Sequence, residues 1–154
     1  MEKKEDEIIW SIIHYNDLSL DQFYDLLELR TAVFVVEQDC PYQEVDIKDK
    51  SSFHVLGYQK EELVAVARII PSGISYPEVS FGRVAVKIDH RGKGIANELT
   101  HKLVKFISAK YQSDIRISAQ CYLTSFYENH GFKIASEEYK EDGIPHIEML
   151  RLAN

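Results

Sequence analysis

Apolar residues follow two patterns along this chain: short runs rich in β-branched and aromatic side chains, and longer segments in which they recur at helical spacing. The runs predict strands and the spaced segments predict helices. Strands are expected over 8–15, 53–59, 63–70, 79–86, 115–119, 132–138 and 147–152, and helices from about residue 20, over 95–107 and over 123–130.

Local signals set several of these boundaries. Ser19 and Gln22 form a capping box, which predicts that a helix starts directly after Ser19. Gly131 suits the position just beyond a helix end. Residues 39–51 are polar, contain a proline and lack a clear period, so we expect a long loop with a functional role.

The predicted order of elements is β, α, β, β, β, α, β, α, β, β. This order predicts a mixed α/β (α+β) fold, with a largely antiparallel central sheet flanked by helices. Residues 1–154 fit one domain, and no internal repeat or linker divides them. The carboxyl end of the 79–86 strand, next to a helix start, is where we expect an anionic ligand.

Charge and composition narrow the function classes. The net charge of −7 argues against a nucleic-acid partner, because phosphate binding needs clustered basic residues that the chain lacks. This charge favours a cationic substrate or serves solubility alone. The apolar stretch after residues 1–7 is too short for a signal segment or a membrane span, so we expect a cytoplasmic protein. Two cysteines, Cys40 and Cys121, match no zinc-ligand spacing and should be reduced.

Residues 87–97, between the 79–86 strand and the following helix, are rich in glycine and basic side chains. Free amides at a helix start carry partial positive charge, and Gly92 and Gly94 let a phosphate approach the main chain. Arg91 and Lys93 add positive charge. The turn therefore suits a diphosphate, although two glycines could equally form a tight turn and nothing more.

Two other phosphate-binding motifs fit this turn poorly. The spacing of a Walker loop is absent, and a Rossmann fingerprint would require glycine where Asn97 stands. A Rossmann-type nucleotide site is therefore a weaker alternative.

The stretch 79–96, taken with 126–132, resembles the GNAT superfamily of acetyltransferases. The signature Arg/Gln-x-x-Gly-x-Gly/Ala of that superfamily is matched by Arg91, Gly94 and Ala96. Its second landmark, a Tyr five residues before the Phe of a Gly-Phe pair, is matched by Tyr127 and Phe132.

Segments near residues 29–43 and 141–147 look like the ElaA-type branch of this superfamily, so the resemblance spans nearly the full chain. It implies an N-acetyltransferase that uses acetyl-CoA. Many members place an Asn, seven residues before the Tyr, against the pantetheine arm; this chain has Gln120, which keeps the amide on a longer side chain. The cofactor-binding residues that the resemblance implies are Val84, Ala85, Val86, Arg91, Gly92, Lys93, Gly94, Ile95, Ala96 and Gln120.

Acetyl transfer to an amine needs an acid and a base, because alkylamines are protonated at neutral pH and the departing thiolate needs a proton. The resemblance implies Tyr127 as the acid, although a Tyr on a short helix usually serves packing. Glu78 is our first candidate for the base, with His54 and His146 as alternatives.

Acceptor binding is the least determined part of the prediction. Glu37, His54, Arg68 and His146 are our candidates for contacts with the substrate, and we expect Arg68 to be paired with an acid. Direct attack by the amine is preferred to a route through an acetylated Cys121. We expect the acceptor to be an amine of a small molecule or a peptide. The sequence is compatible with a homodimer. The alternative function is an acyl-CoA-binding module without catalysis.

Overall fold

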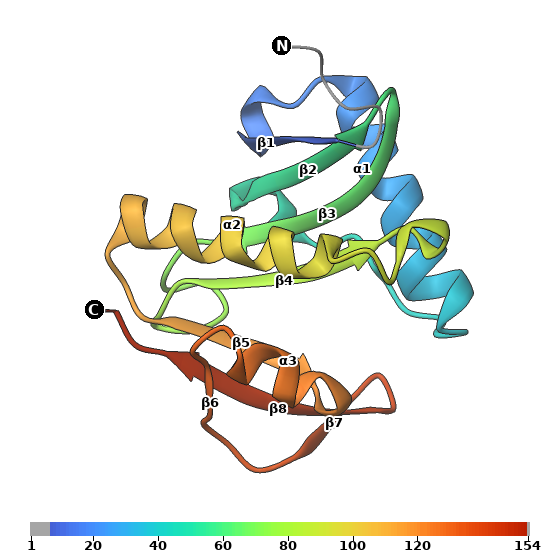
Figure 1. Cartoon of the computed structure of the whole chain (residues 1–154). Coiled ribbons are helices and arrows are strands. Elements are labelled where there is room, and N and C mark those ends of the chain that lie inside the picture. The colour runs from blue at the N-terminus through green and yellow to red at the C-terminus, as the bar shows by residue number, and fades with distance from the viewer. Residues whose placement is uncertain (1–6, 154) are drawn as a thin grey trace.

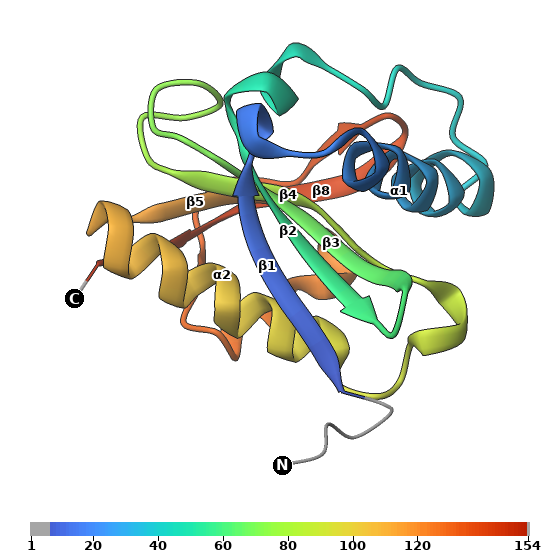
Figure 2. The ribbon, with the colours of Figure 1, turned by 90° about the horizontal axis from the view of Figure 1, so that it is seen from above.

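The computed structural model describes residues 7–153 and shows two twisted sheets side by side, with helices on their faces (Figure 1; Figure 2). The expectation that the chain has no signal segment rests partly on residues 1–6, which lie outside the described residues. Within 7–153, no helix has the length and apolar character to cross a membrane.

The first sheet is antiparallel and has the order β1-β2-β3-β4. β2 and β3 form an antiparallel hairpin, whose turn places Lys60 at a φ of 57°. The strands are β1 (Ile8–His14), β2 (Phe53–Gln59), β3 (Glu62–Ile70) and β4 (Ser80–Val86).

The second sheet has the order β5-β8-β6, with β7 also paired to β8. The strand expected over 132–138 is shorter than predicted, because only Lys133–Ile134 pair with β8, as β6, before β7 begins at Tyr139. β8 starts earlier than expected, since Pro145 lies within the strand opposite Lys140 and does not form a turn. The strands are β5 (Ile115–Gln120), β6 (Lys133–Ile134), β7 (Tyr139–Glu141) and β8 (Ile144–Arg151).

Two long helices cover opposite faces of the first sheet (Figure 2). On one face, α1 (Leu20–Arg30) buries Leu26 against Leu56, and α1 continues directly as a π-helix over Thr31–Glu37. On the other face, α2 (Ile95–Tyr111) buries Leu99 and its neighbours. The shorter helices are α3 (Thr124–Glu128) and 3-10 turns at Tyr15–Asp17, Ile47–Ser51, Ile88–His90 and Cys121–Leu123.

The capping box at the start of α1 is confirmed. The Gln22 amide donates to Ser19 Oγ at 3.0 Å, and the Ser19 amide donates to Gln22 Oε1 at 2.9 Å. These two bonds satisfy donors that a helix start otherwise leaves open, which explains why α1 begins at this point.

β4 carries a bulge at its centre. Val66 and Arg68 of β3 face Ala85 and Gly82 of β4, so β4 has one residue more than β3 over the same interval. The extra residue is accommodated at Arg83, whose φ of 50° is in the left-handed region. The bulge bends β4 next to the opening described below.

Candidate active site

β4 and β5 are adjacent strands that diverge from a single point of contact. Val79 and Ile115 form a parallel bridge, where the Arg116 amide donates to the Val79 carbonyl at 3.0 Å. Within residues 7–153, the two strands form no ladder beyond this bridge, so the β4 edge borders an opening. A cavity of about 810 Å³ lies there and reaches from the start of α2 to the β7–β8 hairpin.

The cavity wall gathers most of the residues that the sequence analysis proposed for binding or catalysis. Glu78, His54 and Lys93 are not part of this wall. The residues that the structure brings together there are Glu37, Arg68, Val84, Ala85, Val86, Arg91, Gly92, Gly94, Ile95, Ala96, Gln120, Tyr127 and His146.

The start of α2 presents main-chain amides to one end of the cavity. Gly92 and Gly94 have φ values of 77° and 81°, and no atom lies within 4 Å of the position that a Cβ would take at either residue. The first hydrogen bond of the helix runs from the Glu98 amide to the Gly94 carbonyl at 3.1 Å. The amides before Glu98 therefore lack an intrahelical acceptor and can bind an anion.

Arg91 is engaged by protein groups at this end of the cavity. Its two terminal nitrogens donate to the Glu37 carboxylate at 2.6 and 2.7 Å, and its Nε donates to the Val86 carbonyl at 2.9 Å. Hydrogen bonds from Arg91 lower the pKa of Glu37. Both charges are thus neutralised by each other, and the pair joins the end of the π-helix to the turn before α2.

Tyr127 lies where the cavity meets the core. Its ring packs against Phe81 and Phe132 with centroid distances of 6.1 and 5.8 Å, and its side chain is buried. The Phe132 amide donates to the Tyr127 carbonyl at 3.2 Å across Gly131, whose φ is 88°. This C-terminal cap explains the fixed spacing from Tyr127 to the Gly-Phe pair. Burial raises the pKa of the Tyr127 phenol, which keeps it protonated at neutral pH.

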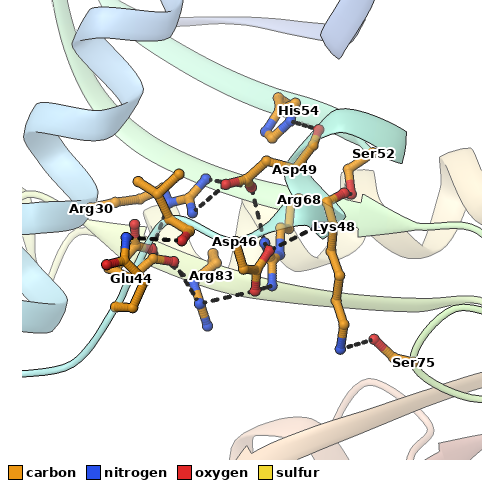
Figure 3. A network of polar contacts seen from close by, with 12 residues as sticks. Arg30, Glu44, Asp46, Lys48, Asp49, Ser52, His54, Arg68, Ser75 and Arg83 are labelled. Atoms are coloured by element: carbon orange, nitrogen blue, oxygen red, sulfur yellow. Dashed lines mark hydrogen bonds and ion pairs between the residues drawn. The ribbon is translucent and has the colours of Figure 1, made fainter.

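A buried network of ion pairs lies at the other end of the cavity (Figure 3). Arg30, which is 1% exposed, donates to Glu44 at 2.7 Å and to both oxygens of Asp49 at 2.9 and 3.1 Å. Arg68 donates to Asp49 at 2.9 Å and to Asp46 at 2.6 and 2.9 Å. Burial alone would raise the pKa of Asp49, but hydrogen bonds from the two arginines bring it below its usual value. The expected acidic partners of Arg68 are confirmed.

Arg83 completes this network from the bulge in β4. Its Nε lies 2.7 Å from Glu44 Oε1, its Nη2 lies 3.5 Å from Asp46 Oδ2, and Nη2 donates to the Glu44 carbonyl at 2.8 Å. Three arginines thus face three carboxylates, and the loop over 39–51 supplies all of the carboxylates.

Comparison with known proteins decides the family. The family model described as "Acetyltransferase (GNAT) domain" matches residues 15–152. The chain belongs to the GNAT acetyltransferase family. Protein ElaA of Escherichia coli is 42% identical over 147 residues, which cover 94% of this chain and 96% of ElaA, so the predicted GNAT resemblance and its ElaA-like branch are confirmed.

Solved structures confirm the predicted GNAT fold class. An acyl-CoA N-acyltransferase from Pseudomonas aeruginosa matches with a TM-score of 0.91 at 36% identity, over 94% of this chain and 99% of that chain. Escherichia coli ElaA matches with a TM-score of 0.89 at 41% identity, with the same coverage. A GNAT acetyltransferase from Elizabethkingia anophelis, solved with acetyl-CoA bound, shares the fold at 15% identity, with a TM-score of 0.64 over 96% of this chain and 99% of that chain.

Two residues proposed for GNAT chemistry have other partners. Glu78 accepts two hydrogen bonds of 3.1 Å from Arg116, which lower its pKa, and it does not line the cavity. The His54 side chain is 2% exposed, and its Nε2 lies 3.0 Å from the Asp49 carbonyl, so the ring supports the network. Desolvation lowers the pKa of His54. Neither side chain is placed to contact a substrate in the cavity.

His146 lines the cavity from β8, opposite Gln120 of β5. Its Nδ1 lies 2.7 Å from the Ile144 carbonyl, which can only accept, so Nδ1 carries a hydrogen. Its Nε2 lies 3.3 Å from a carboxylate oxygen of Glu141, and its ring stacks on Tyr139. In the neutral ring, Nε2 has a free electron pair.

Several polar residues of this GNAT cavity were not predicted from the sequence, including Tyr42, Lys48, Ser75 and Tyr76. The first two belong to the loop over 39–51, for which a functional role was expected, but neither was proposed as a site residue. The other two lie between β3 and β4, in a segment for which no site residue was predicted.

Proposed function

We propose that the protein transfers an acetyl group from acetyl-CoA to an amine. The observation that carries this proposal is one continuous cavity that joins the amides at the start of α2 to the side chain of Tyr127. Membership of the GNAT family supports an acyl-CoA donor, and the same fold holds acetyl-CoA in the Elizabethkingia anophelis protein.

The residues of the amide end fit the diphosphate of coenzyme A. The open space above Gly92 and Gly94 leaves room for phosphate oxygens, and the exposed edge of β4 at Val84 and Val86 offers main-chain groups to the pantetheine arm. Lys93 would add charge from outside the cavity wall, while Arg91 acts as a brace with its charge already paired. When bound, acetyl-CoA supplies an acetyl group activated as a thioester.

Tyr127 would donate a hydrogen bond to the departing sulfur, since its phenol stays protonated and forms no hydrogen bond with any side chain in residues 7–153. His146 replaces Glu78 as our candidate for the base, because its Nε2 can accept the proton that an ammonium must lose before it attacks. Desolvation and nearby Glu138 raise the pKa of the Cys121 thiol, which supports direct attack over an acetyl-cysteine route.

Two measurements test this function. Acetyl-CoA at about 100 times its dissociation constant should add about 2.7 kcal/mol to the free energy of unfolding, and no thermal shift at millimolar acetyl-CoA would exclude the donor. With a panel of amines, Tyr127→Phe should lower kcat for thiol release by about 100-fold or more while leaving the fold intact. His146→Gln should lower kcat as well. Binding of acetyl-CoA without turnover of any amine would favour an acyl-CoA-binding module.

A further inference from the structure

Lys48 is a cation at the acceptor end of the cavity. It belongs to the 3-10 turn Ile47–Ser51, its side chain is partly buried, and its Nζ donates to Ser75 Oγ at 2.9 Å. Among residues 7–153, no carboxylate oxygen lies within 4.0 Å of Nζ. Both Lys48 and Ser75 line the cavity.

The network behind Lys48 does not supply the missing negative charge. Arg30, Arg68 and Arg83 are balanced by the three carboxylates of Glu44, Asp46 and Asp49. Asp46, the most exposed of these acids, is shared between two arginines. The ammonium of Lys48 is therefore in excess over the charges built into this end of the cavity.

Arg83 supplies further unused donor capacity next to Lys48. Its Nη1 forms no hydrogen bond with any residue from 7 to 153, its guanidinium lies 5.6 Å from the ring centre of Tyr42, and its side chain is 22% exposed. In Figure 3, the guanidinium of Arg83 and the ammonium of Lys48 extend from the network toward the same side. A non-glycine residue persists in the left-handed region within a strand only where its surroundings hold it there, so the bulge fixes the direction of this side chain.

The opposite wall of the cavity has the other sign of charge. Glu141 and Asp142 line it from the β7–β8 hairpin, beside His146. The Asp142 carbonyl accepts from Cys40 Sγ at 3.7 Å, so the hairpin touches the start of the loop that carries Lys48. A molecule between these walls meets cationic donors on one side and carboxylates with a histidine on the other.

We propose that the acceptor is an amine that also carries a carboxylate, bound by Lys48, Ser75 and Arg83 while its amino group faces His146. This inference rests on the proposed function and specifies its substrate class as amino carboxylates. Carboxylate oxygens match the free Nη1 of Arg83 and the two remaining hydrogens on Lys48 Nζ.

The test uses amines in pairs that differ only in the anionic group: glycine, β-alanine and γ-aminobutyrate, each against its primary amide, in the thiol-release assay. The wild type should use the acid of at least one pair with a KM about tenfold below that of its amide. Lys48→Gln, which keeps a donor for Ser75, should raise KM for that acid about tenfold and KM for the amide less than about twofold. Lys50→Gln, an exposed neighbour on the same turn, is the matched control and should change neither.

A binding measurement separates this inference from the proposed function. The N-acetyl derivative of each acid and of its amide is added to the protein saturated with coenzyme A, and the thermal shift is recorded for the wild type and Lys48→Gln. If the wild type binds the N-acetyl acid better than its amide, and Lys48→Gln removes this preference, the acceptor site is supported. This holds even if no amine turns over, and in that case only the proposed function fails. Equal or better use of the amides, or no selective binding of the acids, would overturn the inference. Arg83→Gln is a second variant, which should lose the same preference for the acid. If Arg83→Gln does not fold, the result for Lys48→Gln alone decides the test.

Discussion

The two ends of the cavity differ in the groups that line them, which are main-chain amides at one end and paired charged side chains at the other. At the start of α2, the main-chain amides before Glu98 lack an intrahelical acceptor, and open space lies beside Gly92 and Gly94. At the other end, three arginines and three carboxylates have already neutralised one another in the protein interior. The amides at the start of α2 therefore stay available to a ligand. At the network end, most of the charged side chains are already paired, and these ion pairs hold the loop over 39–51 against the sheet.

This contrast bears on how each end tolerates change. Amide donors belong to every residue, so the amide end depends on backbone shape at Gly92 and Gly94 more than on side-chain identity. The network end depends on identity, because a buried ion pair that loses one partner leaves a charge without compensation.

The largest effect is expected at the centre of the network. Asp49→Asn leaves Arg30 and Arg68 short of a carboxylate in the interior, and the free energy of unfolding should fall by about 3–5 kcal/mol in denaturant titrations. The matched control is Glu62→Gln, which removes an exposed ion pair with Lys87 and should cost less than about 1 kcal/mol. Equal losses in the two variants would mean that burial does not distinguish them.

A smaller effect is expected at the amide end. Gly94→Ala forces a side chain to adopt a φ of 81° and should cost about 1–2 kcal/mol of stability. Its methyl group would also fill the space above the main chain, so we expect about tenfold weaker binding of acetyl-CoA by calorimetry.

Gly73→Ala provides the control for Gly94→Ala. Gly73 has a φ of 84° and open space around it, but it does not line the cavity. It should show the same loss of stability with unchanged affinity for acetyl-CoA. A loss of affinity in both variants would indicate that backbone strain, and not the blocked amides, is responsible.

The smallest effect concerns the pH dependence of the network. Because desolvation lowers the pKa of His54 below 6.5 in the folded state, the unfolded state takes up a proton first as the pH falls through 6.5. Stability should therefore decrease over the first pH unit below that value, by less than about 1 kcal/mol from this group. His54→Gln, which keeps a donor toward the Asp49 carbonyl, should flatten this part of the stability profile. An unchanged slope would show that other groups control acid sensitivity.

The parts of the molecule that the sequence predicted well are those encoded by short spacings. The capping box at Ser19, the turn before α2 and the helix end before Gly131 each depend on residues within a few positions of one another. Local backbone geometry decides such features, so pattern and propensity suffice to predict them.

The network could not be predicted in detail for the opposite reason. Arg30, Arg68 and Arg83 come from three elements, and a sequence with many acids offers each of them several partners. The start of β8 was missed because Pro145 favours a turn, and only the pairing with Lys140 of β7 shows that the strand accommodates it.

The bulge in β4 also limits how this strand can be exchanged between proteins. Phe81 and Val84 contact the same core although they are an odd number of residues apart, whereas Val84 and Val86 follow the usual alternation. A chimera that received a straight strand, shorter by the residue at Arg83, would have to invert the faces of its side chains on one side of the junction. Recombination within this family should therefore succeed only when donor and recipient share the extra residue.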